Sequence, residues 1–228
     1  GPILKMKKTM DSLVSGDRVE ITSTDPGFPR DAAAWCNSTG NQLISKETAG
    51  GKSVVVIEKG EPKSCNIVTS CEGKGKTFIM FSDDLDKALA TFVLANGAAA
   101  TGQKVTIFFT FWGLNVIKKL HKPNVEKDIF GKMFGMMLPS SSRKLKLSKM
   151  SMGGIGGKMM RYIMNRKGID SLESLRQQAL ENGVEFIACQ MSMDVMGVKQ
   201  EELLDEVTIG GVATYMERAD NANINLFI

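Results

Sequence analysis

The residue best suited to chemistry is Cys189, which ends the apolar run of residues 184–189 and precedes the methionine-containing segment QMSMDVMG. A thiolate at this position could attack sulfur, and it could carry a persulfide. A cysteine at the end of an apolar strand could equally be a packing residue, because cysteine is among the most buried residue types. Position alone therefore leaves both roles open.

The other three cysteines are weaker candidates. Cys36 falls in a short predicted helix, where core packing is its expected role. Five residues separate Cys65 from Cys71, which is not the C-x-x-C spacing of zinc or redox sites, so we expect exposed thiols there. His121 is the only histidine and lies far from Cys189 in the sequence. Neither a structural metal site nor a Cys–His hydrolytic site is therefore indicated.

Basic residues are concentrated in residues 116–168. This segment holds 13 lysines and arginines, two acidic residues and eight of the 15 methionines, whereas the rest of the chain has 16 basic and 23 acidic residues. Lys158 and Arg161 lie among methionines in an amphipathic stretch that could bind an anionic partner or an anionic membrane surface. Aromatic residues do not alternate with these charges, so nucleic acid is not an expected partner. The alternative is a solvated cover over the rest of the domain.

Length and composition indicate a folded protein of two domains, with 228 residues of which 43% are apolar and 24% charged. No apolar run approaches the roughly 18 residues of a membrane-spanning helix, and residues 1–11 contain no apolar secretory segment. Four cysteines are too few for a disulfide scaffold. We therefore expect a cytoplasmic location, with peripheral membrane association as the option that the basic segment offers.

The first 60 residues predict a small two-layer α/β sandwich. Apolar residues at helical spacing in residues 3–15 are followed by an alternating strand in residues 17–24 and a short helix over residues 30–37. Residues 41–60 contain two strands with a Gly-Gly turn between them. The order is helix, strand, helix, strand, strand.

A second pattern begins after a polar linker, residues 61–75. Apolar strands are predicted over residues 77–82, 104–110 and 184–190, and helices over residues 83–102 and 170–183. Continuous apolar strands separated by helices are typical of a parallel sheet covered on both faces. We therefore predict a doubly wound α/β domain over residues 76–228.

The basic segment, residues 116–168, interrupts this pattern between the second and third strands. It is too long for a simple connection in a compact domain, which favours a functional insertion or a mobile lid. Gly153, Gly154, Gly156 and Gly157 argue against one rigid conformation. They do not form a phosphate-binding loop motif, so nucleotide binding is not indicated there.

Residues 1–60 resemble TusA-like (SirA-like) sulfur-carrier domains. The resemblance rests on SGDRVEI, on the turn and helix TDPGFPRDAAAWC, and on the closing IEKG. In that family a Cys-Pro-x-Pro motif starts the first helix, and its cysteine carries a persulfide. Gly1 and Pro2 match only the last two positions of the motif. We therefore expect the first strand and the Cys-Pro pair to lie upstream of this sequence.

Residues 76–228 resemble DsrE-like sulfur-trafficking proteins in FFTFWGLNVIKK, in the Met/Gly-rich basic segment and in ACQMSMDVMG. The resemblance implies a homo-oligomer and a loop cysteine that accepts sulfane sulfur, here Cys189. A TusA-like domain followed by a DsrE-like domain also resembles the C-terminal part of coenzyme A disulfide reductase-type flavoproteins. Flavin and nicotinamide binding would belong to other parts of such proteins, so no cofactor is expected here.

These observations together predict a sulfur relay, and a sulfurtransferase if the protein is an enzyme. The Cys189 thiolate would attack a persulfide on a sulfur-carrier protein or on an upstream rhodanese-like domain. Met191 and Met193 are expected to contact the substrate or partner near the thiol, and Lys158 and Arg161 to attract a sulfur-bearing anion. The alternatives are a non-catalytic docking module that binds a membrane or an acidic partner, and an accessory domain of a coenzyme A disulfide or polysulfide reductase.

Overall fold

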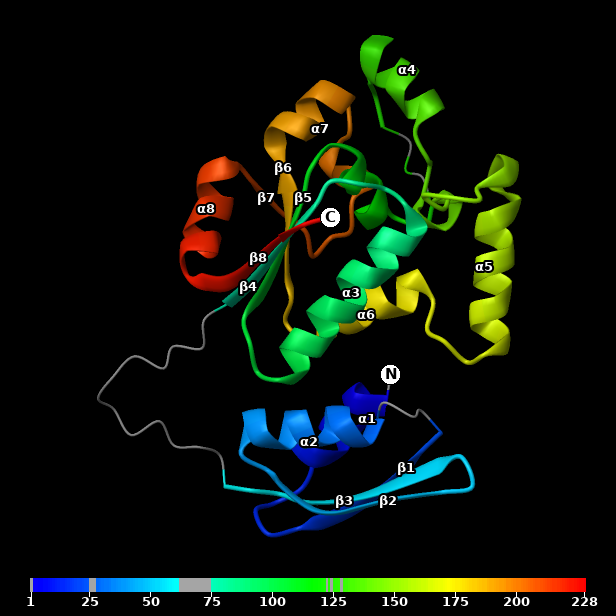
Figure 1. Ribbon diagram of the computed structural model, residues 1–228. Coiled ribbons are helices and arrows are strands. Elements are labelled where there is room, and N and C mark those ends of the chain that lie inside the picture. Colours follow the sequence, from blue (N-terminus) through cyan, green and yellow to red (C-terminus); the bar gives the residue numbers. More distant parts are fainter. Residues whose placement is uncertain (1, 25–27, 62–74, 122, 124, 128) are drawn as a thin grey trace. The chain divides into compact units, whose positions relative to one another are not determined.

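The computed structural model describes residues 2–24, 28–61, 75–121, 123, 125–127 and 129–228 (Figure 1). It forms two compact units, an N-terminal one that contains the first three strands and a C-terminal one that contains the other five. Within the described residues, no helix combines the length and apolar character needed to span a bilayer.

The N-terminal unit is a two-layer sandwich. Its elements are α1 (Pro2–Asp11), β1 (Arg18–Ser23), α2 (Phe28–Thr39), β2 (Gln42–Ala49) and β3 (Lys52–Glu58). The antiparallel sheet has the order β1-β3-β2, and the helices cover one of its faces. Alternation along β3 buries Val55 and Ile57 on that face, where they meet Met6 and Met10, one helical turn apart on α1. The predicted order of elements and the sandwich are confirmed.

The C-terminal unit is built on a parallel sheet of five strands. They are β4 (Gly75–Met80), β5 (Val105–Phe109), β6 (Glu185–Cys189), β7 (Thr208–Gly210) and β8 (Ala222–Phe227). The strand order is β7-β6-β5-β4-β8, and each neighbouring pair is parallel. The predicted parallel sheet is therefore confirmed, and β7 is a strand that the sequence pattern did not predict.

Helices lie on both faces of this sheet (Figure 1). They are α3 (Leu85–Ala100), α6 (Leu172–Glu181), α7 (Gln190–Met196) and α8 (Val212–Asp220), with a short 3-10 helix η4 (Gln200–Glu202). Helices α3 and α6 cover the face of the main core, where the tilted rings of Phe92, Phe109 and Phe186 pack with centroids 5.3 to 6.4 Å apart. Helix α8 packs on the opposite face. The doubly wound fold class is confirmed.

The segment between β5 and α6 contains further helices. They are η1 (Phe111–Ile117), α4 (Ile129–Met137), η2 (Ser142–Lys144), η3 (Met152–Gly154) and α5 (Ile155–Arg166). Buried Arg176 of α6 donates to the carbonyl oxygen of Val116 at 2.7 Å, and the amide of Leu85 donates to that of Lys146 at 2.7 Å. The described part of this insertion is therefore hydrogen-bonded to the helices of the main core.

The glycines of the insertion serve a defined geometry. Gly153 and Gly154 have φ of 66° and 99°, a left-handed conformation that turns the chain into α5. Gly156 packs so closely on the carbonyl group of Met150 that a Cβ atom would overlap its oxygen. At this turn two of the glycines provide positive φ and one provides a close approach, and the expectation that they work against a single rigid conformation stays a prediction.

Candidate functional site

Cys189 closes β6 at the carboxyl-terminal edge of the parallel sheet. Ala188 is in register with Phe109 of β5, and Cys189 is in register with Gly210 of β7. Ligands and reacting groups in open α/β sheets gather outside these strand ends. Helix α7 begins at the next residue, with Cys189 as its N-cap, so strand and helix join without a loop. The resemblance had led us to expect a loop cysteine.

The Cys189 side chain lies on the face of the sheet that α8 covers. It packs in a small cluster with Phe108, Ile187 and Tyr215, and it is 2% exposed. The rings of Phe108 and Tyr215 are 5.2 Å apart, and the Tyr215 hydroxyl lies 3.2 Å from the hydroxyl of Thr77 on β4. Tyr215 therefore holds α8 over the sheet next to the thiol.

The two methionines expected to contact a substrate, Met191 and Met193, lie on different sides of helix α7. Met193 is 4% exposed and packs into the main core, whereas Met191 is 55% exposed. The hydroxyl groups of Ser192 and Thr110 lie 2.8 Å apart, which joins α7 to the end of β5. Of the two expected contact residues, only Met191 is thus available to a substrate or partner.

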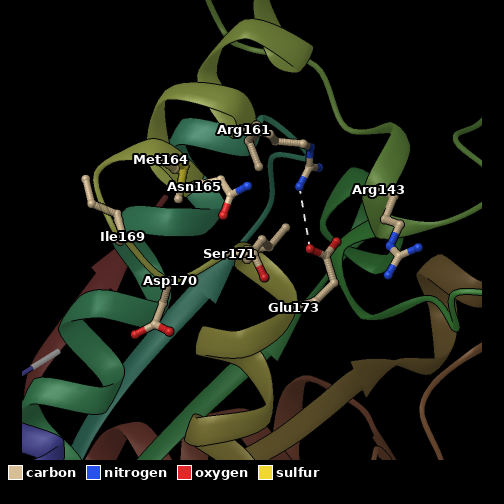
Figure 2. A pocket seen from close by; sticks show the side chains of 11 residues that line it. Arg143, Arg161, Met164, Asn165, Ile169, Asp170, Ser171 and Glu173 are labelled. Carbon is tan, nitrogen blue, oxygen red and sulfur yellow. Dashed lines mark ion pairs between the residues drawn. The ribbon is translucent and has the colours of Figure 1, made fainter.

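Lys158 and Arg161 lie on α5, away from the thiol. Arg161 donates to the carbonyl oxygen of Ser142 at 2.9 Å and forms an ion pair with Glu173 at 3.5 Å (Figure 2). Lys158 is exposed to solvent. Arg161 lines a pocket of about 590 Å³, and none of its described lining residues comes from β6 or α7. The structure therefore does not bring these two basic residues to Cys189.

A different part of the insertion reaches the cysteine's helix. Gly197, which ends α7 with φ of 59°, lies directly against Gly131 of α4. Helix α4 carries Met133, Met136 and Met137, which are all exposed. The methionine-rich insertion is therefore divided, with α4 next to α7 and α5 next to α6.

The remaining cysteines and the histidine do not extend the site. Cys36 is buried in α2, and burial raises the pKa of its thiol from 9.0 to about 11, which disfavours the thiolate. The prediction of a core role for Cys36 is confirmed. Cys65 and Cys71 lie outside the described residues, and His121 is exposed. In the part of the chain that the structure describes, no three metal-binding side chains come together.

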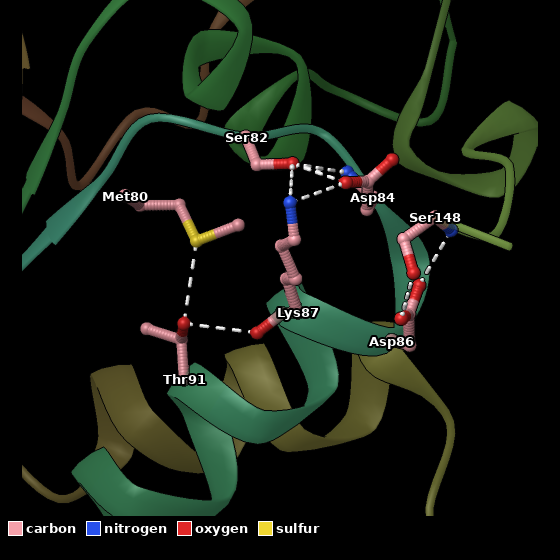
Figure 3. A network of polar contacts seen from close by, with 7 residues as sticks. All are labelled: Met80, Ser82, Asp84, Asp86, Lys87, Thr91 and Ser148. Carbon is pink, nitrogen blue, oxygen red and sulfur yellow. Dashed lines mark hydrogen bonds and ion pairs between the residues drawn. The ribbon is translucent and has the colours of Figure 1, made fainter. Parts of the chain in front are cut away.

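A polar network at the start of α3 was missed by the sequence analysis (Figure 3). Ser82 donates to Asp84 at 2.7 Å, and Lys87 forms an ion pair with Asp84 at 2.8 Å. Ser148 of the insertion donates from its amide and its hydroxyl to Asp86, at 2.9 and 2.6 Å. Burial alone would raise the pKa of Asp86, but the bonds from Ser148 outweigh it and lower that pKa. Serine and aspartates directly after a strand are a helix-start signal that could have revealed this network.

Comparison with known proteins supports the two-domain interpretation. The model of the DsrE/DsrF/DrsH-like family matches residues 73–227. The chain belongs to this family. The model of sulfurtransferase TusA matches residues 1–59, so the chain is a TusA domain fused to a DsrE-like domain. The resemblances to TusA-like and DsrE-like proteins are thereby confirmed, whereas the resemblance to coenzyme A disulfide reductase-type flavoproteins stays a prediction.

Three relatives are each similar to a part of the chain. The uncharacterized protein YrkE of Bacillus subtilis is 44% identical over 155 residues, which cover 68% of this chain and 97% of that protein. The sulfur carrier protein DsrE2 of Allochromatium vinosum is 38% identical over 161 residues, which cover 69% of this chain and 99% of that protein. The sulfur carrier protein TusA of the same organism is 40% identical over 58 residues, 25% of this chain and 76% of that protein.

Proposed function

We propose that this protein relays sulfane sulfur and that Cys189 of the DsrE-like domain carries it as a persulfide. The observation that carries the proposal is the position of Cys189 at the carboxyl-terminal edge of the sheet, because it is the only cysteine in residues 75–228. Family membership and relatives named as sulfur carriers supply the context. The test is intact-protein mass after incubation with polysulfide, followed by peptide mapping, with a gain of one sulfur atom expected at Cys189.

The proposed step is a thiol–persulfide exchange. The Cys189 thiolate attacks the outer sulfur of a persulfide on a sulfur-carrier protein or a rhodanese-like domain, and a new sulfur–sulfur bond forms at Cys189. The donor's sulfur–sulfur bond breaks, and the donor cysteine leaves as a thiolate. The transferred sulfur keeps its oxidation state, so no external oxidant or reductant is needed.

The burial of Cys189 means that the step requires a local opening. Thiol exchange needs access of the attacking sulfur to its partner, and a side chain that is 2% exposed does not provide it. Helix α8 is the element that covers the thiol, and its C-terminal half is followed directly by the exposed edge strand β8. We propose that displacement of α8 around Tyr215 exposes Cys189.

Replacing Tyr215 by alanine is expected to raise the alkylation rate of Cys189 roughly tenfold or more. The substitution removes both the ring contact with Phe108 and the hydroxyl contact with Thr77, and a loss of about 1.4 kcal/mol in closing free energy is enough for that change. The measurement is the rate of iodoacetamide labelling, read by peptide mass. Tyr162→Ala, at an exposed site on α5, is the matched control and should leave the rate unchanged. An unchanged rate in Tyr215→Ala would show that α8 is not the cover.

Docking to an anionic membrane is a second candidate function, favoured by the surface of α5 and of the residues that flank it in the chain. Exposed apolar side chains there lie next to basic ones. They are Met150, Met152, Ile155, Met159, Tyr162 and Ile163, with Lys149, Lys158, Arg166 and Lys167. Apolar side chains surrounded by lysine and arginine fit an interface with anionic lipid headgroups.

We expect flotation with phosphatidylserine vesicles to be lost in Met159→Glu, because the substitution places a negative charge in the apolar face of α5. Met216→Glu is the matched control, since Met216 on α8 is 48% exposed and Met159 is 47% exposed. Wild-type binding should weaken as salt is raised. Equal flotation of both variants, or equal binding to neutral vesicles, would contradict membrane docking through α5.

Two further implications of the resemblance are also proposals. Self-association is supported by the edge strand β8, which exposes Ile224, Leu226 and Phe227. An accessory role in coenzyme A disulfide or polysulfide reduction would use the same Cys189 thiol. It is supported by the order of the TusA and DsrE-like domains alone.

A further inference from the structure

The pocket of about 590 Å³ beside α5 has the size of a small-molecule site and is independent of Cys189. Its walls come from η2, from α5 and from the start of α6 (Figure 2). Polar side chains that line it are Arg143, Arg161, Asn165 and Ser171, together with the carboxylates of Asp170 and Glu173. Two arginines therefore line one concave site, and each guanidinium presents five hydrogen-bond donors that suit the oxygen atoms of an anion.

The two arginines differ in how they are held. Arg161 is fixed by the carbonyl oxygen of Ser142 and by Glu173, and Glu173 also accepts from the Ser142 hydroxyl at 2.9 Å. Arg143 is exposed, and no hydrogen bond or ion pair joins it to the described residues. Burial lowers the pKa of Arg161, Glu173 opposes this, and the positive charge of Arg143 lowers it further. The pocket therefore holds one neutralised guanidinium and one without a counter-ion.

The other lining groups add donors and an apolar wall. The amide group of Asn165 is exposed, and the Ser171 oxygen accepts from the amide of Ser174 at 3.2 Å, which leaves its hydroxyl proton free to donate. Asp170, which also lines the pocket, accepts from the Ser174 hydroxyl at 3.0 Å. Met164 and Ile169 form the apolar part of the lining.

We propose that this pocket binds a small amphiphilic anion, with its oxyanion head group on Arg143 and Arg161 and its apolar body against Met164 and Ile169. A carboxylate, phosphate or sulfonate can accept hydrogen bonds from both guanidinium groups, and the bonds are strengthened by charge. Such an anion neutralises Arg143 and relieves its repulsion from Arg161. The pocket lies on the same insertion that carries the positive charge of the chain, which attracts anions from solution.

The test is titration calorimetry of the full chain with three probes, octanoate, octyl phosphate and inorganic phosphate. We expect saturable binding of one molecule of octanoate or octyl phosphate, and the tighter of the two identifies the preferred head group. Inorganic phosphate should bind at least roughly tenfold more weakly than octyl phosphate, because it leaves the apolar wall uncovered. Amide chemical-shift changes should fall on residues 164–173.

Substitution of Arg143 separates a specific site from general attraction by basic charge. Arg143→Gln should weaken binding by roughly tenfold or more, since a charged hydrogen-bonding group is lost. Lys144→Gln removes the same charge one position away, outside the lining of this pocket, and should change affinity by less than about twofold. Equal losses in the two variants would overturn the proposal, as would the absence of saturable binding or equal binding of phosphate and octyl phosphate. Both exposed substitutions should leave the thermal midpoint unchanged, and Cys189 sulfur loading is unaffected by either result.

Discussion

The Cys189→Ala variant is expected to take up no sulfur on the DsrE-like domain after incubation with polysulfide, a complete loss relative to the wild-type chain. The thiolate is both the attacking group and the atom that holds the transferred sulfur, so no neighbouring side chain can replace it. Cys189→Ser should give the same result. Its hydroxyl would be buried in the cluster of Phe108 and Tyr215, at a cost of about 1–3 kcal/mol, which is why alanine is the better variant.

The matched control for this prediction is Cys36→Ala. Cys36 is also buried, but the raised pKa of its thiol and its place in the TusA domain core make it an unsuitable acceptor, so loading should persist in this variant. Peptide mapping separates Cys189 from Cys65 and Cys71. Two results would show that Cys189 is only a packing residue. One is sulfur that still appears on the DsrE-like domain of Cys189→Ala, and the other is labelling of Cys65 and Cys71 equal to that of Cys189 in the wild-type chain.

The second large effect is expected from Glu202→Gln, which should destabilise the DsrE-like domain by about 3 kcal/mol. Glu202 forms an ion pair with Lys127 of the insertion at 2.6 Å, and the two side chains are only 5% and 7% exposed. Removing the carboxylate charge leaves the lysine ammonium buried without a counter-ion. Glutamine can still accept a hydrogen bond from the amide of Lys199, as Glu202 does at 2.9 Å. The loss of stability is therefore due mainly to the removed negative charge.

The stability of each domain can be followed with its own tryptophan. Trp35 lies in the TusA domain and Trp112 in the DsrE-like domain, so a Trp35→Phe background makes fluorescence report urea unfolding of the second domain alone. Glu201→Gln is the control, because Glu201 is exposed and the charge change is the same. It should alter the free energy of unfolding by no more than about 0.5 kcal/mol. Equal effects of the two substitutions would show that the ion pair with Lys127 contributes little.

Most of the fold was predictable because its signals are local. The apolar runs that form β4, β5 and β6 do not alternate with polar residues, as expected for strands covered on both faces. In the helices between them, apolar residues recur at helical spacing. Strand β7 was missed since it has only three residues, Thr208–Gly210, and is formed by pairing with β6. A segment this short carries no periodic signal of its own.

The candidate site was predictable only in part. The position of Cys189 at a strand end follows from its local sequence, but its burial under α8 depends on Tyr215, which is distant in the chain. Met191 and Met193 are neighbours in sequence, yet they lie on different sides of α7, one exposed and one in the core. Arg161 contacts Glu173 instead of the thiol.

The sequence by itself determined the two domains, their families, the parallel sheet and the cysteine at its edge, because periodicity and turn chemistry act within a few residues. Only the tertiary structure decided which side chains share a site. It placed α4 against α7 and α5 against α6, so Arg161, which was expected beside Cys189, lines a separate pocket, and Lys158 is exposed on the same helix. The reason is physical: contacts between distant segments depend on how whole elements pack, and this packing leaves no periodic pattern in the segments themselves.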